Sequence, residues 1–199
     1  MYWKSLNSNN VSYGFVAMDA TLVPGPKRPF NFFGSLDATE LEHFKNILSE
    51  AQQKTDYQLV FGHYPTSCVL TPNPGLKSII GQNQNSLAYL CGHLHTLNGI
   101  IPHMYSSQPE GFLELELGDW KDNRIYRILV IDQGQLIFKD LVHDPNRASL
   151  AILTNPMDMN FIQPDNFSLI QSSTHIRYVL NTISNKSLNL VNDNNIFWS

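Results

Sequence analysis

The sequence predicts an α/β fold followed by a smaller all-β segment, and three observations lead to this prediction. Two short apolar runs, Leu59 to Phe61 and Leu87 to Cys91, are separated by helical segments, which is typical of sheet strands covered on both faces. An amphipathic helical pattern precedes the first run. Beyond position 146 only short β-type runs remain, so we expect an α/β unit over residues 1–146 and the start of a β-sandwich over residues 147–199.

The composition is that of a folded protein without a basic surface. The 199 residues are 42% hydrophobic and 15% charged, which is ordinary for a globular domain and far from the balance of a disordered chain. The formal net charge is −4 and the Lys and Arg residues are scattered, so we expect no nucleic-acid partner. No window reaches the roughly 18 uninterrupted apolar residues that a membrane helix needs. Cys68 and Cys91 are interpreted as small buried hydrophobic residues.

A strand and a helix are predicted in the first part of the chain. Val11 to Thr21 carries loosely alternating apolar residues and ends at a Pro-Gly-Pro turn, which indicates a strand. Asp37 and Glu40 form a capping-box pattern, in which Asp37 accepts from amides of the first turn and Glu40 reaches back. The helix should run to about Lys54 and bury one apolar face, formed by Leu41, Phe44, Ile47, Leu48 and Ala51.

The middle of the chain reads as strand, loop, short helix and strand. Tyr57 to Phe61 is a short β-type run, Leu76 to Ile80 is weakly helical, and Leu87 to Cys91 is the second buried strand. Functional residues in such sheets usually lie beyond the carboxyl ends of the strands.

From Gly99 onward the pattern changes to β. Phe112 to Leu117 alternates strictly between apolar and charged residues, and Tyr126 to Ile131 is joined by a turn to Gln135 to Leu141. We expect these segments to form an antiparallel meander that closes the domain.

Short strands are predicted beyond the boundary near position 146. They are Leu150 to Leu153, Phe167 to Ile170 and Ile176 to Leu180. These strands are too few to bury two sheets, so we expect an incomplete sandwich.

Three histidines follow the two buried strands. His63 comes after Gly62, and His93 and His95 lie in Gly92-His93-Leu94-His95. Glycine lets the backbone turn tightly, and in an extended Gly-His-x-His segment alternate side chains point the same way. The three imidazoles are therefore candidate metal ligands, because imidazole suits Zn, Fe, Mn and Ni. The other four histidines are interpreted as structural residues: His43, His103, His143 and His175.

These residues resemble the C-terminal half of a calcineurin-like metallophosphoesterase over roughly residues 11 to 141. In that family a Gly-His and a Gly-His-x-His loop supply the last three histidine ligands of a dinuclear centre. Four segments are more closely similar to the transmembrane protein 62 family, which joins a phosphoesterase domain to an immunoglobulin-like domain and C-terminal membrane helices. They are Asn9 to Asp19, Tyr89 to Thr96, Gly118 to Arg124 and Ser172 to Arg177.

The resemblance implies a fold and a metal centre. Residues 1–146 would be the C-terminal half of an αββα sandwich, and residues 147–199 the start of an immunoglobulin-like sandwich. In the complete protein His63 and His93 would bind one divalent ion and His95 a second, with Fe, Mn or Zn as the metals. A metal-bridging hydroxide would attack the phosphorus of a phosphate-ester substrate.

The resemblance also implies a membrane-anchored parent protein, which would contact the membrane through segments outside this chain. The domain would be lumenal or extracellular. Tyr64, Thr66 and Asn98 flank the histidine loops and are candidates for contact with the phosphate ester, although capping of the loops explains them equally well.

Several motifs of the family's first half do not occur in the sequence. They are an Asp-x-His, a Gly-Asp that precedes the histidine loops and whose carboxylate bridges the metals, and a Gly-Asn-His-Asp or -Glu; the Gly118-Asp119 pair of this sequence lies after those loops. Three histidines cannot complete two metal sites, so we expect the missing N-terminal half of the domain to supply the remaining ligands. Asp19 and Asp119 are the nearest substitutes, and we expect both to cap turns.

Three basic residues of the predicted meander allow two interpretations. Lys121, Arg124 and Arg127 would either form a solvated hairpin face or attract an anionic substrate.

Three hypotheses for the chain follow. It is a portion of a metal-dependent phosphoesterase, inactive when isolated. Alternatively, it is a non-catalytic, membrane-associated interaction module on a degenerate phosphoesterase scaffold. In the third, Met1 is an internal methionine of a truncated gene model.

Overall fold

The fold is built on a six-stranded sheet in the order β1-β2-β4-β6-β8-β7. The computed structural model describes residues 1–27, 30–83, 85–97, 99–101, 103–147, 149–162 and 174–182. The elements are β1 (Tyr2–Ser8), β2 (Val11–Ala17), β3 (Gly34–Ser35), α1 (Ala38–Lys54), β4 (Tyr57–Phe61), β5 (Val69–Leu70), α2 (Leu76–Gly81), β6 (Ser86–Cys91), β7 (Tyr105–Ser107), β8 (Leu113–Glu116), β9 (Ile125–Asp132), β10 (Gln135–Val142), β11 (Ser149–Asn155) and β12 (Arg177–Thr182).

The four central strands are parallel. Strands β2, β4, β6 and β8 pair in that order, so their carboxyl ends meet at one edge of the sheet. Strand β1 pairs antiparallel with β2, and the two are joined at Asn9 and Asn10, whose φ angles of 51° and 63° suit a tight hairpin turn. Strand β1 was not predicted, because this edge strand is mostly polar and exposed, without a buried alternating face.

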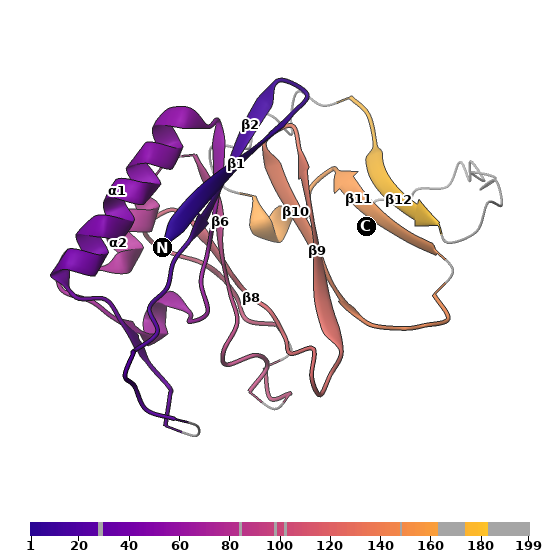
Figure 1. Cartoon of the computed structure of the whole chain (residues 1–199). Helices are drawn as coiled ribbons and strands as arrows, with labels where there is room; N and C mark the ends of the chain where they lie inside the picture. Colours follow the sequence, from indigo (N-terminus) through magenta and orange to yellow (C-terminus); the bar gives the residue numbers. More distant parts are fainter. Residues whose placement is uncertain are drawn as a thin grey trace.

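Helices α1 and α2 cover one face of the sheet (Figure 1). The predicted capping box of α1 is confirmed, since the Asp37 side chain accepts from the Glu40 amide at 2.8 Å and Glu40 accepts from the Asp37 amide at 2.9 Å. The five apolar residues predicted on its buried face are all buried. They pack against sheet residues such as Val16, Val60 and Tyr89 in one core cluster.

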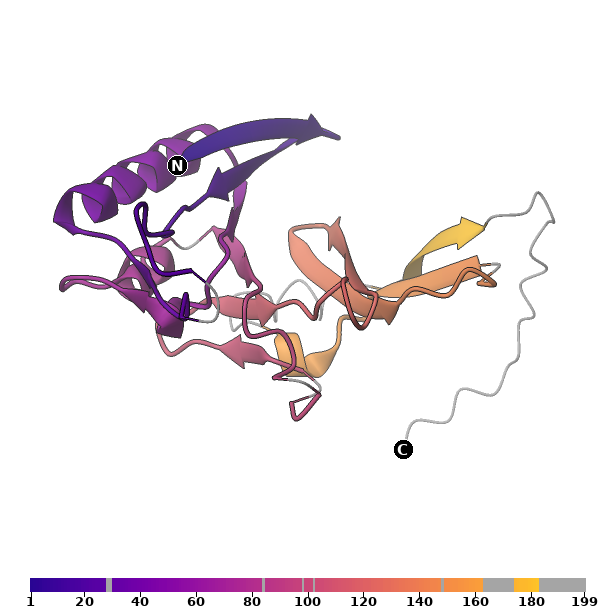
Figure 2. The same ribbon diagram turned by 60° about the horizontal axis from the view of Figure 1, so that its bottom comes forward.

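The β9–β10 hairpin covers part of the opposite face of the sheet (Figure 2). Leu136 of β10 shares a buried cluster with Leu59, Ala88 and Leu115 of the central strands. The predicted antiparallel meander is therefore wrong in one respect: β8 is a parallel strand of the main sheet, while β9 and β10 form a separate two-stranded sheet. The alternating pattern of β8 misled the prediction because all four of its residues, charged ones included, are buried.

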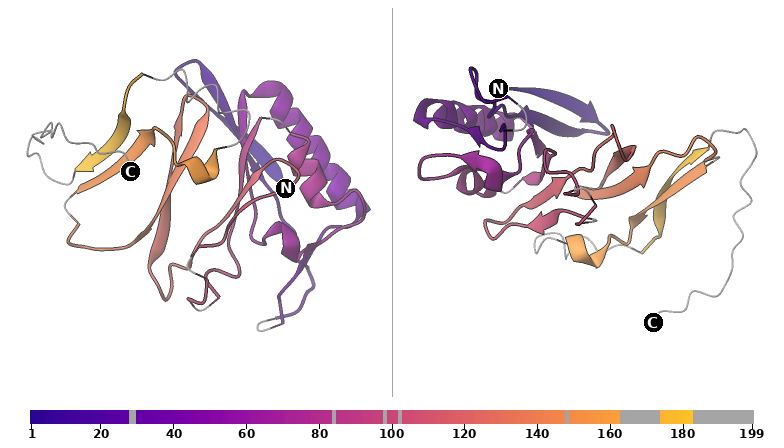
Figure 3. Two further views of the ribbon diagram at one scale, coloured as in Figure 1. Left: turned by 180° about the vertical axis from the view of Figure 1, so that it is seen from behind. Right: turned by 90° about the horizontal axis from the view of Figure 1, so that it is seen from below.

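Strands β11 and β12 form an antiparallel pair beyond the hairpin. Figure 3 shows this pair and α1 at opposite ends of the molecule. The Arg177 guanidinium of β12 donates to Asp132 of β9 at 2.7 Å, which ties the pair to the hairpin. The predicted strand Phe167 to Ile170 lies outside the described residues. Neither α1 nor α2 has the length and apolar composition needed to cross a bilayer, and the described residues include no other helix that does.

Candidate functional site

Two loops at the carboxyl edge of the parallel strands carry the candidate histidines. His63 follows β4 and His93 follows β6. The loops are bonded to each other through the backbone, because the Gly62 amide donates to the Leu90 carbonyl and the Gly92 amide donates to the His63 carbonyl, each at 3.0 Å. Their spacing is therefore fixed by the sheet.

The side chains of His63 and His93 are in direct contact. The Nε2 atom of His63 lies 3.0 Å from Nδ1 of His93, and the ring centroids are 4.9 Å apart. The Nε2 atom of His93 lies 3.0 Å from the Phe32 carbonyl oxygen, which can only accept a hydrogen bond. In a neutral His93, Nε2 therefore carries the hydrogen and Nδ1 accepts from His63. The buried Tyr64 ring packs against both imidazoles, at 4.8 Å from His63 and 4.5 Å from His93.

His95 takes a different environment on the same loop. Its backbone amide donates to Oε1 of Glu116 at 2.6 Å. It also lines a pocket of about 110 Å³ together with His103, Tyr105 and Asp140. The predicted extended Gly-His-x-His conformation is wrong: His93 and His95 have φ angles of 89° and 54°, so the loop curls and alternate side chains need not point the same way.

The histidine pair suits part of a metal site. Two nitrogen ligands of one tetrahedral ion lie about 3.4 Å apart when each bond is about 2.1 Å, which is close to the 3.0 Å between the two ring nitrogens. Within the described ranges, however, no three His, Cys, Asp or Glu side chains gather as a metal site requires. These residues thus do not fit a complete metal centre, because a closed site has about four ligands.

Asp19 and Asp119 cap turns, as predicted. The Thr21 amide and hydroxyl donate to Asp19 at 2.9 Å and 2.6 Å, and the hydroxyl hydrogen bond lowers the pKa of the Asp19 carboxyl. Asp119 accepts from the Asp122 amide at 2.5 Å and from Asn123. These hydrogen bonds lower the pKa of Asp119 to about 2.

Of the three residues predicted to contact a phosphate ester, Tyr64 and Thr66 are described by the structure, and each has its own hydrogen-bond partner. The Tyr64 hydroxyl donates to the Asn31 carbonyl at 3.4 Å. Thr66 is buried and donates its amide, at 3.2 Å, and its hydroxyl to Glu114. Asn98 lies outside the described residues.

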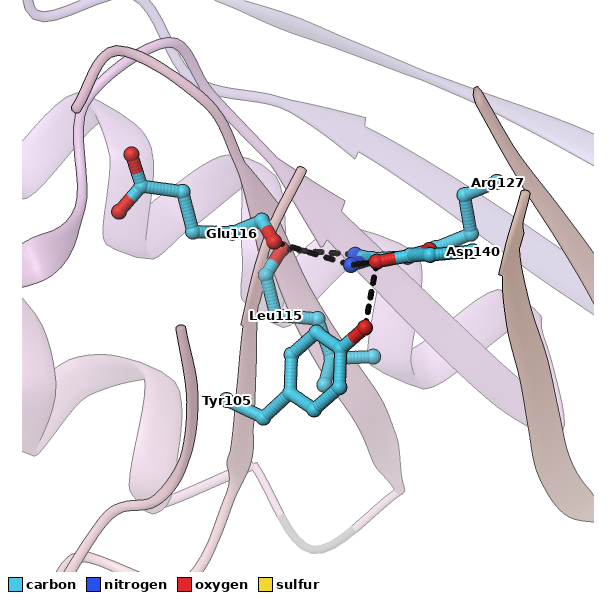
Figure 4. A network of polar contacts seen from close by, with 5 residues as sticks. All are labelled: Tyr105, Leu115, Glu116, Arg127 and Asp140. Carbon is cyan, nitrogen blue, oxygen red and sulfur yellow. Dashed lines mark hydrogen bonds and ion pairs between the residues drawn. The ribbon is translucent and has the colours of Figure 1, made fainter. Parts of the chain in front are cut away.

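Lys121 and Arg124 are exposed, as the solvated-face interpretation predicts, whereas Arg127 is neither solvated nor available to an anionic substrate. Its side chain is 5% exposed and donates to Asp140 at 2.6 Å and 2.7 Å. It also donates to the backbone carbonyls of Leu115 and Glu116, at 3.0 Å and 2.9 Å. Tyr105 donates its hydroxyl to the same carboxylate at 2.6 Å (Figure 4). This network pins the hairpin to β8, which no local pattern could have indicated.

The burial of two glutamates of β8 was also not predicted. Glu114 is 6% exposed and Glu116 is 4% exposed. Burial raises the pKa of Glu114, and it raises the pKa of Glu116 to about 7. The available signal was two carboxylates inside an otherwise apolar run, Phe112 to Leu117.

Comparisons with curated proteins identify relatives that agree with the resemblance inferred from the histidine motifs. Transmembrane protein 62 of Mus musculus is 39% identical over 175 residues, covering 87% of this chain and 26% of that protein. A protein of Arabidopsis thaliana named as a metallophosphoesterase is 30% identical over 186 residues, covering 74% of this chain and 25% of that protein. Tartrate-resistant acid phosphatase type 5 of Sus scrofa is 28% identical over 144 residues, covering 65% and 40%.

The chain spans about a quarter of the length of the first two relatives, 26% and 25%. No family model matches it. The resemblance predicted from the two histidine loops is confirmed: the chain is similar to transmembrane protein 62 and to metallophosphoesterases.

Proposed function

We propose that the chain forms part of the active site of a metal-dependent phosphoesterase, within a longer protein that hydrolyses a phosphate ester. The observation that carries the proposal is the contact between His63 and His93 at the carboxyl edge of the sheet. The two imidazole nitrogens lie 3.0 Å apart and share one hydrogen, so a cation that displaced this hydrogen would be bound by both rings. Relatives named as a metallophosphoesterase and an acid phosphatase support the same chemistry.

In this proposal the histidines bind two divalent ions and do not act as acid or base. His63 and His93 would hold one ion and His95 the second, with the remaining ligands supplied by the N-terminal half of the domain in the longer protein. The metals, of Fe, Mn or Zn, would supply Lewis-acid stabilisation of the phosphoryl oxygens. Tyr64 contacts both imidazole rings, so of the two ester-binding candidates that the structure describes, Tyr64 and Thr66, it is the one beside the pair. Thr66 has its hydroxyl engaged by Glu114, and it would contact the ester only after that bond opens.

We further propose the domain division expected from the sequence. Residues 1–146 form half of an αββα sandwich, and residues 147–199 begin an immunoglobulin-like domain. The antiparallel pairing of β11 with β12 supports a β-type second unit. By similarity to transmembrane protein 62, the longer protein is anchored in a membrane through segments outside this chain, with this domain lumenal or extracellular.

Hydrolysis by the full-length protein tests the proposal. The protein is assayed with Mn²⁺ or Fe²⁺ against aryl phosphate esters, and turnover should fall by at least a hundredfold in His63→Ala and His93→Ala. His43→Ala is the matched control, because this histidine is exposed on α1. Unchanged turnover in His93→Ala would reject the proposal.

A non-catalytic interaction module is the second candidate. It is favoured by one observation: in the described part of the chain only an incomplete ligand set comes together. If the full-length protein neither retains divalent metal on purification nor hydrolyses any phosphate ester, the module becomes the better account.

A further inference from the structure

We infer that Glu114 and Glu116 are positioning residues, which hold the two histidine loops to β8. The inference rests on the proposed function, because the loops matter for activity only if their histidines bind metal. Neither glutamate is offered as a ligand or as a catalytic group.

Glu114 holds the loop that carries His63. Its carboxylate accepts hydrogen bonds from the Thr66 amide, at 3.2 Å, and from the Thr66 hydroxyl. Thr66 lies three residues beyond His63 on this loop. It also accepts from the Gln108 side chain at 3.2 Å. A second tie reaches the same loop from the neighbouring strand, because the buried Tyr89 hydroxyl donates to the Tyr64 carbonyl at 2.6 Å.

Glu116 holds the loop that carries His93 and His95. Its Oε1 atom accepts the His95 amide at 2.6 Å. Figure 4 shows the carboxylate of Glu116 pointing away from Arg127 and Asp140, although the backbone carbonyl of the same residue accepts from Arg127. Glu116 therefore makes two separate contacts: its side chain binds the histidine loop, and its backbone carbonyl binds Arg127.

The register of the sheet explains why one strand reaches both loops. Glu114 lies beside Tyr89 and Glu116 beside Cys91 in the parallel pairing of β8 with β6. Residues two apart on a strand point to the same face of the sheet. Both carboxylates therefore lie on one face, and from there they reach the loops that follow β4 and β6.

Burial of these carboxylates is unfavourable unless the hydrogen bonds they accept compensate for lost solvation. Within the part of the chain that the structure describes, neither carboxylate forms an ion pair with Lys or Arg. Apolar side chains would fill the same positions at a lower desolvation cost, because replacing buried charged groups with apolar ones of similar volume is often neutral or stabilising in other proteins. The glutamates are therefore better explained by the loop amides and hydroxyl that they bind than by core stability.

Four variants of the full-length protein test the inference. Glu114→Met and Glu116→Met remove the acceptors and keep the side-chain length, whereas Glu114→Gln and Glu116→Gln keep one acceptor oxygen. Asp56→Leu is the control, because Asp56 likewise accepts an amide and a hydroxyl of one residue, Ser12 at 2.8 Å and 2.6 Å. Ser12 lies near the amino end of β2 and Asp56 directly precedes β4, so both lie at the sheet edge opposite the histidine loops.

The first readout is hydrogen exchange by mass spectrometry, without added metal. In Glu114→Met the peptide covering residues 62–67 should exchange about tenfold faster, and in Glu116→Met the peptide covering residues 92–97 should do so, since each variant removes the buried side-chain acceptor of a loop amide. The Gln variants should change less, and Asp56→Leu should leave both peptides unchanged. Unchanged exchange in both Met variants would overturn the inference; if a Met variant does not fold, unchanged exchange in its Gln counterpart would do so.

The second readout is the visible absorption of bound Co²⁺, which a purely structural role would leave unaltered. We expect the Met variants to bind Co²⁺ at least tenfold more weakly than the unmodified protein, and the Gln variants to recover part of the loss. If the unmodified protein binds no Co²⁺, the proposed function fails, while the exchange measurement still decides whether the glutamates position the loops.

Discussion

Breaking the buried ion pair between Arg127 and Asp140 should lower the free energy of unfolding by about 3–5 kcal/mol, as for other buried pairs that lose one partner. The two side chains are only 5% and 13% exposed, and two hydrogen bonds of 2.6 Å and 2.7 Å join them. In Asp140→Leu the guanidinium loses its counter-charge and Tyr105 loses the acceptor of its hydroxyl.

The magnitude stays below the sum of the lost interactions. Hydrogen bonds to charged groups contribute about 1.5–3 kcal/mol each, and three are lost in Asp140→Leu. The carbonyls of Leu115 and Glu116 still accept from Arg127, so part of its polar environment remains. The rings of Tyr105 and Phe138, whose centroids lie 5.4 Å and 5.0 Å from the guanidinium carbon, also remain in contact with the cation.

Urea denaturation of the 199-residue chain measures the effect in a double-mutant cycle. Asp140→Leu and Arg127→Met should each be strongly destabilising, whereas the double variant should be more stable than either single variant, because it leaves no buried charge unpaired. Lys54→Met is the control, since its ion pair with Glu50 is exposed on α1 and should contribute little. A loss below about 1 kcal/mol in both single variants, or additive losses in the double variant, would refute the reasoning.

Three further predictions concern the helix layer and β8. Phe44→Ala should cost about 3–5 kcal/mol in urea denaturation, because the ring is fully buried under α1; a cost under 1 kcal/mol would be inconsistent with this packing. Asp37→Ala should cost about 1 kcal/mol by removing the N-cap of α1, and helix content that is unchanged near the midpoint would argue against it. Burial raises the pKa of the Glu114 carboxyl above 4.5, so the contribution of this group to the free energy of unfolding is fully present below pH 4.5 and is lost as the pH rises through the folded-state pKa. The stability of Glu114→Gln should lack this pH dependence. Identical profiles of stability against pH for the variant and the unmodified protein would contradict the raised pKa.

Local patterns predicted the elements whose signals are contained in a few residues. The capping box at Asp37 and the apolar stripe of α1 define the helix, and β4 begins and ends where its apolar run does, at Tyr57 and Phe61. His63 and His93 were predicted to follow two buried strands, and the structure shows that these strands, β4 and β6, are parallel neighbours. That topology brings the two loops together, whereas the 3.0 Å contact between the rings also depends on the unpredicted backbone conformation of His93.

Features set by contacts between distant residues were not predictable in the same way. The pairing of β8 with β6 and the burial of Arg127 depend on residues far apart in the sequence. The positive φ angles of His93 and His95 are uncommon for residues other than glycine, so an extended loop was the natural expectation. The role of Glu114 and Glu116 emerges only when the loops are seen against β8.

The metal content of the purified full-length protein tests the central claim most directly. If His63 and His93 hold a divalent ion, the unmodified protein and the His43→Ala control should carry the same stoichiometric metal, and His63→Ala and His93→Ala should each lose at least one equivalent. Equal metal content in all four proteins, or no bound metal in the unmodified protein, would contradict the account.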